Sequence, residues 1–284
     1  MIQIRLMSMD DVPLGMRLKE QAGWNQTDAD WRRFLALEPD GCFVAELDTP
    51  GAGRQPVGTA TTCVFDSVGW IGMLLVEKDL RGRGIGTQLM SHCLEHLDRR
   101  GVPTIRLDAT PMGRPIYEKL GFVVEYDLVR VEGVAAGSGS HPGVTPVTPD
   151  RLGAVFALDA HIKNTNRRRL IQRLYQERPE SMYVFLENEK VLGYVTFRDG
   201  TRATQIGPAV ALNAEAGRDL GDTALDRLGD RTVFVDIPTD NRSAMRWAES
   251  KGLVVQRPLT RMRRGKPVDD QPALQWASSG PEKG

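Results

Sequence analysis

The segment from Met73 to Leu97, MLLVEKDLRGRGIGTQLMSHCLEHL, constrains the fold of this chain more than any other. Its apolar start predicts a strand that ends at Val76, and a glycine-rich loop follows between Arg81 and Thr87. A helix then begins at once, because apolar residues recur on one helical face. The first N–H groups of a helix and its dipole favour phosphate groups. The segment therefore predicts a mixed α/β chain that binds a phosphate-bearing ligand.

Three kinds of phosphate loop compete for this segment. A Walker A loop needs a lysine before its Ser or Thr, and no lysine precedes Thr87. A dinucleotide fingerprint needs a third glycine, but Leu89 stands in that position. The third pattern, [QR]-x-x-G-x-[GA], is matched by Arg81, Gly84 and Gly86. A plain turn with glycines for steric reasons is the alternative that needs no ligand.

The stretch from Thr104 to Phe122 narrows the choice. It predicts a strand, a loop, a short helix that ends in Tyr117-Glu-Lys-Leu-Gly-Phe, and a further strand. With Arg81–Gly86, this order of parts resembles the GNAT superfamily of acyl-CoA-dependent N-acetyltransferases over most of residues 1–133. The whole chain is similar to the two-domain bacterial members. That resemblance implies an α/β fold of tandem domains, each with a mixed, mostly antiparallel central sheet flanked by helices.

Residues 134–149, VAAGSGSHPGVTPVTP, mark the clearest boundary in the sequence. The stretch lacks Asp, Glu, Lys and Arg and is dense in Gly, Ser and Pro, so it predicts a linker. We expect a catalytic domain at 1–133 and a diverged copy without a phosphate loop at 150–266. The polar residues 267–284 are expected to form a flexible tail, with Trp276 as its anchor.

The resemblance implies roles for named residues. The backbone of one strand would bind the pantetheine amides of acetyl-CoA, and the following loop would surround its pyrophosphate. These positions are Leu74, Leu75 and Val76 on the strand, and Arg81, Gly82, Arg83, Gly84, Ile85, Gly86 and Thr87 in the loop. Tyr117 would be the general acid that protonates the leaving thiolate. A phenol suits that role, because its pKa of about 10 keeps it protonated at neutral pH.

A general base is harder to assign. Where several relatives carry Glu or His early in the phosphate strand, residues 70–72 are Trp, Ile and Gly, which do not titrate. The first candidate from elsewhere is Asp108, with loop capping as its alternative role, and Glu77 and Glu125 are weaker candidates. Two other possibilities stay open: a water relay could carry the proton, or the acceptor could arrive as the free amine and need no base.

The second half repeats the order of strands and helices but not the chemistry. It has no Arg-x-x-Gly-x-Gly loop, and Ala248 stands at the tyrosine position, although Asn241-x-x-Ala244 is kept. We therefore expect this copy neither to hold CoA phosphates nor to donate a proton. Trp24 and Trp31 flank the segment that forms the acceptor wall in relatives, so each is a candidate for acceptor contact or for core packing.

Composition excludes several classes of protein. Lys plus Arg and Asp plus Glu both number 37, so no net positive charge attracts nucleic acid. Hydrophobic residues make up 40%, too many for a disordered chain. We also expect no membrane segment and no secretory signal. Three scattered cysteines without metal-ligand spacing favour a reduced, cytoplasmic protein that holds no metal.

The sequence therefore predicts an acetyl-CoA-dependent N-acetyltransferase that transfers acetyl directly to an amine of a small molecule or peptide. The alternative is a non-catalytic CoA-binding sensor or interaction protein. The absence of a titratable residue at positions 70–72 of the phosphate strand favours this alternative. We expect a monomer or a homodimer.

Overall fold

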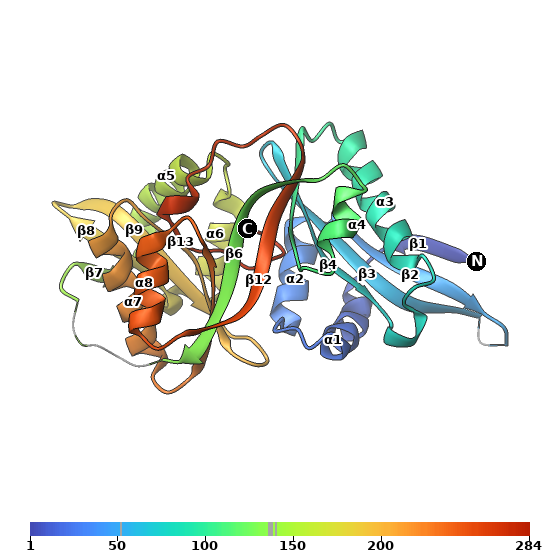
Figure 1. Ribbon diagram of the computed structural model, residues 1–284, viewed down its shortest axis with the longest axis horizontal. Coiled ribbons are helices and arrows are strands. Elements are labelled where there is room, and N and C mark those ends of the chain that lie inside the picture. The colour runs from blue at the N-terminus through green and yellow to red at the C-terminus, as the bar shows by residue number, and fades with distance from the viewer. Residues whose placement is uncertain (52, 136–138, 140) are drawn as a thin grey trace. The chain divides into compact units, whose positions relative to one another are not determined.

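The computed structural model describes residues 1–51, 53–135, 139 and 141–284. Contacts between Cα atoms group these residues into two compact units. Unit 1 comprises Met1–Arg106 together with Gly200–Arg202, and unit 2 comprises Leu107–Asp199 together with Ala203–Gly284. Figure 1 shows the helices and strands of both units.

Unit 1 is built on a sheet with the strand order β1-β2-β3-β4-β5. Neighbours are antiparallel as far as β4, and β5 runs parallel to β4. The strands are β1 (Ile2–Leu6), β2 (Cys42–Thr49), β3 (Gly53–Phe65), β4 (Val68–Val76) and β5 (Thr104–Ala109), the last of which continues into unit 2. The helices are α1 (Val12–Gln21), α2 (Asp28–Leu37) and α3 (Ile85–Arg99), with short 3-10 turns at Met9–Asp11, Pro39–Gly41 and Lys78–Leu80.

Local capping explains why these helices begin where they do. Ser8 and Asp11 form a capping box at the turn that leads into α1, and Thr27 and Asp30 form another at the start of α2. Each box satisfies backbone N–H groups that a helix start leaves free. Both pairs also have the three-residue spacing by which a sequence indicates a helix start.

Unit 2 holds a sheet with the strand order β12-β6-β11-β10-β9-β8-β7, and β13 also pairs with β10. Its strands are β6 (Val123–Val134), β7 (Val144–Pro146), β8 (Met182–Glu187), β9 (Lys190–Arg198), β10 (Thr204–Ala211), β11 (Thr232–Pro238), β12 (Val254–Gly265) and β13 (Gln275–Ala277). Its helices are α4 (Arg114–Glu118), α5 (Leu152–Lys163), α6 (Arg168–Glu177), α7 (Ala214–Leu228) and α8 (Arg242–Ser250), with 3-10 turns at Pro149–Arg151, Pro179–Ser181 and Pro272–Leu274.

The two units repeat one unusual feature, a bulge in the strand that precedes the long helix. In β4, Met73 and Leu74 together stand opposite the single residue Ala60 of β3. In β10, Gly207 and Pro208 together stand opposite Thr196 of β9. The first bulge residue has a positive φ in both cases, +50° at Met73 and +127° at Gly207. The predicted duplication of the fold is therefore visible in backbone detail.

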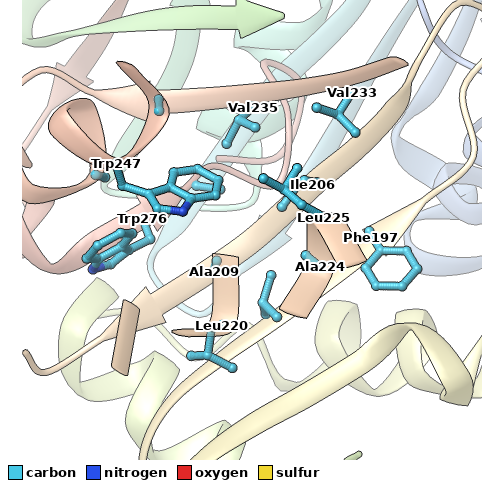
Figure 2. Packing of buried hydrophobic residues seen from close by; sticks show 14 of the residues in the cluster. Phe197, Ile206, Ala209, Leu220, Ala224, Leu225, Val233, Val235, Trp247 and Trp276 are labelled. Carbon is cyan, nitrogen blue, oxygen red and sulfur yellow. The ribbon is translucent and has the colours of Figure 1, made fainter. Parts of the chain in front are cut away.

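The core of unit 2 surrounds α7 and the strands β9, β10 and β11. Figure 2 shows its apolar side chains, with Trp247 and Trp276 side by side. Their rings are 6.2 Å apart at an interplanar angle of 64°, an edge-to-face contact. The core of unit 1 includes Trp31, which has no exposed surface and packs against Gly15 of α1.

The division by contacts differs from the boundary predicted at residues 134–149. Strand β6, expected in the first domain, lies in unit 2 between β11 and β12 and is antiparallel to both. The expected linker includes the whole of β7, and its residues 136–138 and 140 lie outside the described residues. Because strand pairing joins residues far apart in the chain, local composition does not reveal it.

The prediction of a flexible tail does not hold for residues 275–284. Gln275–Ala277 form β13 against β10, and Ser278 and Lys283 have no exposed surface. Trp276 is buried, as an anchor should be. The polar composition of the tail led to the wrong prediction, because its charged groups form ion pairs inside unit 2. Glu282, for example, lies 3.3 Å from Arg198.

Candidate functional site

The loop that precedes α3 has the backbone conformation that its glycines allow. Gly82 has a φ of +78° and Gly84, the N-cap of α3, has a φ of +81°. Such conformations are costly for residues with a Cβ. A Cβ at either position would meet no atom within 4 Å, so the glycines serve the turn and leave the space beside the loop open. At Gly86 a Cβ would only touch Leu74 and Val76, both at 3.7 Å.

The N-terminus of α3 is suited to an anion. Gly84 provides no side-chain cap, and the first turn, which includes Ile85 and Thr87, contains no acidic residue. Arg81 and Arg83 are exposed beside it, and the Arg81 Nε donates to the Val76 carbonyl at 3.1 Å. This bond ties the loop to the end of β4. The helix dipole and two guanidinium groups thus add positive potential at one place in unit 1.

Strand β4 has a free edge at residues 71–76. Its pairing with β5 covers only Val68–Trp70, and the described structure gives Ile71–Val76 no strand partner on that side. On the other side, β3 pairs with Leu75 and Val76, and the Thr59 hydroxyl donates to the Met73 carbonyl at 3.0 Å. A strand edge of this kind offers N–H and C=O groups to an extended ligand. Leu74, Leu75 and Val76 all lie on this edge.

Tyr117 belongs to unit 2, where it lies near the end of α4. Its ring contacts the Phe122 ring at a centroid distance of 6.0 Å, and a Cβ at Gly113 would come within 3.0 Å of it. Burial raises the pKa of Tyr117 above its usual value of about 10. Among the described residues the structure gives the hydroxyl no hydrogen-bond partner, so its proton is not committed to another group of the chain. Thr110 holds this turn, because its Oγ1 accepts from the Gly113 N–H at 3.2 Å.

Asp108 lies in a buried ion pair of unit 2. Both its oxygens accept from Arg261, from Nε and Nη2, each at 2.8 Å, and neither side chain has exposed surface. Burial is the main influence on the pKa of Asp108 and raises it, and Arg261 opposes that rise. Arg261 also donates to the Tyr126 hydroxyl at 2.6 Å. A carboxylate held this way on both oxygens is a structural group, and this geometry argues against the role of general base.

The weaker base candidates are also paired. Glu77 accepts from Gln21 at 2.7 Å and from Arg17 at 3.1 Å. Burial by itself would raise the pKa of Glu77, but these two hydrogen bonds outweigh it and lower the pKa overall. Glu125 lies 3.5 Å from the Arg263 Nε.

The two tryptophans proposed for acceptor contact differ in exposure. Trp31 is fully buried and its indole lies 2.6–2.8 Å from the position of a Gly15 Cβ, so it is a core residue. Trp24 is half-buried in the loop between α1 and α2. The predicted acceptor contact of Trp31 is therefore wrong, because its side chain is buried in the core. Acceptor contact by Trp24 stays a prediction.

The loop that contains Trp24 contacts a turn that lies far along the chain. Residues Gly200–Arg202, which follow β9, group with unit 1. The Thr201 N–H donates to the Asn25 carbonyl and the Arg202 N–H to the Asn25 Oδ1, each at 2.9 Å. The Lys19 Nζ donates to the Thr201 hydroxyl, also at 2.9 Å. A short polar turn gives no sequence signal for such a distant partner.

Two general properties of the described residues bear on function. They include no group of three or more His, Cys, Asp and Glu side chains arranged to hold a metal ion. No helix among them has the length and apolar character that crossing a membrane requires. Cys42, Cys63 and Cys93 are buried and form no disulfide in the described structure, and burial raises the pKa of Cys42 and of Cys93.

Two family models match this chain. Residues 13–122 match the Acetyltransferase (GNAT) family, and residues 155–276 match the Acetyltransferase (GNAT) domain. An uncharacterized N-acetyltransferase of Archaeoglobus fulgidus is 35% identical over 109 residues, 38% of this chain and 71% of the relative. The holothin acyltransferase of a Pseudoalteromonas species is 26% identical over 246 residues, 86% of this chain and 81% of the relative.

A solved structure agrees with these matches. A putative acetyltransferase of Pyrococcus horikoshii has a TM-score of 0.84 and 25% identity, over 100% of this chain and 96% of the other. Both halves of the chain thus carry the GNAT fold, and the relatives are named for acyl transfer. The chain therefore belongs to the GNAT family of acetyltransferases, carries two GNAT domains and is an acyltransferase.

Proposed function

We propose that this protein is an acetyl-CoA-dependent N-acetyltransferase whose cofactor-binding loop is the one that precedes α3. The observation that carries the proposal is the combination of an uncapped helix N-terminus, an open glycine loop and a free strand edge in one unit. A pyrophosphate fits the loop and N–H groups between Gly82 and Thr87. The peptide-like amides of a pantetheine arm fit the edge formed by Leu74, Leu75 and Val76.

Tyr117 is the proposed general acid. Acetyl-CoA supplies a thioester, whose carbonyl carbon accepts an amine. As the carbon–nitrogen bond forms and the carbon–sulfur bond breaks, the Tyr117 hydroxyl donates its proton to the departing sulfur. Its raised pKa keeps that proton in place at neutral pH. The tyrosine regains a proton from solvent after each turnover.

No base is assigned to this reaction. Asp108 is fully engaged with Arg261, and the lowered pKa of Glu77 makes it a weak proton acceptor. We propose that the acceptor enters as the free amine and loses its surplus proton to water. Bringing two bound reactants together then supplies much of the rate.

The acceptor is proposed to be an amine of a small molecule or peptide. The relative named holothin acyltransferase, which this chain matches over most of both lengths, supports a small-molecule acceptor. The test is release of free thiol from acetyl-CoA with a panel of small amines and amino-terminal peptides. Turnover with at least one amine is expected. Tight CoA binding without turnover on any of them would instead favour a CoA-binding sensor.

A further inference from the structure

Residues 275–278 cover the part of β10 that corresponds to the free edge of β4. If the two bulges are aligned, Ala209 takes the place of Leu75 and Val210 the place of Val76. Strand β13 pairs with these two residues, Ala277 with Ala209 and Gln275 with Val210. The strand edge that is open in unit 1 therefore has a counterpart in unit 2 that is paired with the protein's own chain.

The same segment is also bonded on its other flank. The Ser278 N–H donates to the Asp236 carbonyl of β11 at 2.8 Å. The Asn241 Nδ2 donates to the Gln275 carbonyl at 3.1 Å, while the Asn241 Oδ1 caps α8 by accepting from the Ala244 N–H. The described pairing of β10 with β11 covers Thr204–Ile206. The segment pairs with β10 just beyond that stretch, at Ala209 and Val210.

The Trp276 side chain occupies space that glycines on α7 provide. A Cβ at Gly217 would fall 1.8 Å from the Trp276 indole, and a Cβ at Gly221 would fall 2.6 Å from the Trp247 ring. Figure 2 shows both indoles in the core beside α7. The residual cavity lined by these residues is about 10 Å³, the space of a single water molecule. Packing at this place is therefore complete.

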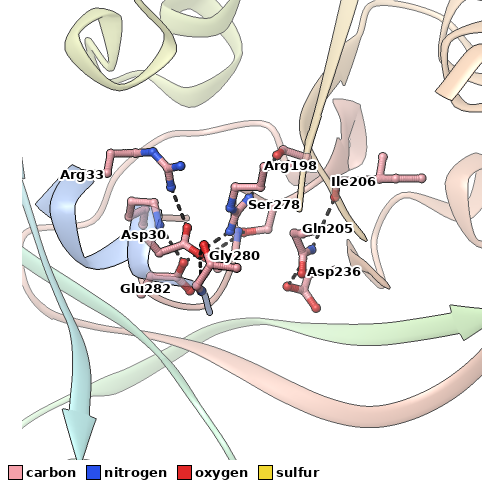
Figure 3. A network of polar contacts seen from close by, with 12 residues as sticks. Asp30, Arg33, Arg198, Gln205, Ile206, Asp236, Ser278, Gly280 and Glu282 are labelled. Carbon is pink, nitrogen blue, oxygen red and sulfur yellow. Dashed lines mark hydrogen bonds and ion pairs between the residues drawn. The ribbon is translucent and has the colours of Figure 1, made fainter. Parts of the chain in front are cut away.

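Polar groups on both sides of the segment hold it in register. A Cβ at Gly207 would overlap the Ser278 carbonyl oxygen, only 2.1 Å away, so the β10 bulge is shaped to receive the chain. Arg198 donates to the Gly207 carbonyl and to Glu282, each at 3.3 Å. Figure 3 shows Arg198 beside Ser278, Gly280 and Glu282, with Gln205 directed to Asp236.

The helix that follows β10 also lacks the anion site of α3. The Asn213 side chain caps α7 by accepting from the Ala216 N–H at 2.8 Å, and Glu215 lies in the first turn. A filled cap and a negative charge oppose phosphate binding at this N-terminus.

We propose that residues 275–278 are a built-in occupant of unit 2. They make with β10 the backbone contacts that the pantetheine arm of an acyl-CoA is proposed to make with β4. The comparison with β4 rests on the proposed function, but the occupancy of β10 does not. Unit 2 is thereby closed to acyl-CoA, and its GNAT fold is completed by its own chain in place of a cofactor.

Hydrogen exchange of the full-length protein, with and without CoA, tests this inference. Amides of residues 209–211 and 275–278 are expected to exchange at least about 10³-fold more slowly than an unstructured chain without any ligand, as core strands do. Added CoA should leave them unchanged and should protect residues 74–76 and 84–87. In Trp276→Ala, and more mildly in Trp276→Phe, residues 209–211 should exchange at least about 10-fold faster, whereas Trp24→Ala should leave them unaffected.

Two results would overturn the inference. One is exchange of residues 275–278 at the rate of an unstructured chain, and the other is loss of their protection when CoA is added. A different result separates the two proposals. If CoA leaves residues 84–87 unchanged while 275–278 stay protected, the proposed cofactor site falls and the built-in occupant stands.

Discussion

The N-terminal ends of α3 and α7 follow equivalent bulged strands but are chemically opposite. Helix α3 begins at Gly84 with a positive φ, no side-chain cap and no acidic residue in its first turn. Helix α7 begins at Asn213, which caps it, and carries Glu215 in its first turn. The strand edges differ in the same sense, since residues 71–76 of β4 have no described strand partner on the β5 side, whereas the equivalent side of β10 pairs with β13. One fold thus leaves a helix N-terminus and a strand edge open in one copy and closes both in the other.

The largest expected effect comes from removing the hydroxyl of Tyr117, the proposed proton donor, whose counterpart in the second GNAT domain is Ala248. Tyr117→Phe keeps the ring and its contact with Phe122 but removes the hydroxyl, so kcat should fall by roughly 10²–10⁴-fold. CoA affinity should change little. The check is steady-state kinetics with a titration of CoA, and Ala248→Ser serves as the matched control at the equivalent position of the second GNAT domain. A Tyr117→Phe variant with unchanged kcat would show that the proton comes from elsewhere or that chemistry is not rate-limiting.

The next effect is on the loop that precedes α3. Gly84→Glu places a carboxylate beside the proposed pyrophosphate, and two like charges about 5 Å apart at an effective dielectric constant of 20 repel by ~3 kcal/mol. CoA affinity should therefore fall by about 100-fold, as measured by calorimetry. Gly101→Glu is the matched control, because Gly101 also has a positive φ of +67° and open space but lies at the other end of α3. Equal affinities in the two variants would remove the loop from the CoA site.

A smaller effect, on stability alone, is expected when the core of unit 2 is changed at Trp276. Trp276→Ala removes a buried indole from a core with little free space, which costs roughly 3–5 kcal/mol in the free energy of unfolding. Denaturant unfolding should show this loss, whereas Trp24→Ala, at a half-buried tryptophan, should cost clearly less. Similar costs at both sites would mean that Trp276 packs less tightly than the structure indicates.

The smallest effect is a pH dependence from two histidines of α3, whereas α7 itself contains no histidine. Burial is the main cause that lowers the pKa of His92 and of His96, and nearby arginines lower both further. Both are therefore neutral in the folded state at a pH where the unfolded chain, with a histidine pKa of about 6.5, already binds protons. Stability should fall as the pH drops below about 6.5.

Thermal unfolding at pH 7.5 and at pH 5.5 measures this dependence. The drop in Tm should shrink in a variant with His92→Gln and His96→Gln, because the titrating groups are gone. The same drop in the variant and in the native protein would assign the pH dependence to other groups.

Features encoded by neighbouring residues could be predicted from the sequence. The capping boxes at Ser8 and Thr27, the strand-loop-helix around Gly84 and the repeated order of elements all follow from local patterns. Each depends on residues within a few positions of one another, so capping rules and periodicity suffice.

Features that depend on distant partners could not be predicted. Asp108 pairs with Arg261, 153 positions away, and nothing near Asp108 indicates that its carboxylate is already engaged. The pairing of β6 with β11 and β12, and of β13 with β10, joins segments whose own compositions were typical of a domain edge and a tail. Gly217 and Gly221 were the available signal, because glycines inside a helix often mark close packing.

The two GNAT domains are proposed to differ in whether a cofactor can enter. The most direct test is the stoichiometry of CoA binding to the full-length protein, measured by calorimetric titration. One CoA per chain is expected, lost in Gly84→Glu and kept in Gly101→Glu. Two molecules of CoA per chain, or one that persists at full affinity in Gly84→Glu, would contradict it.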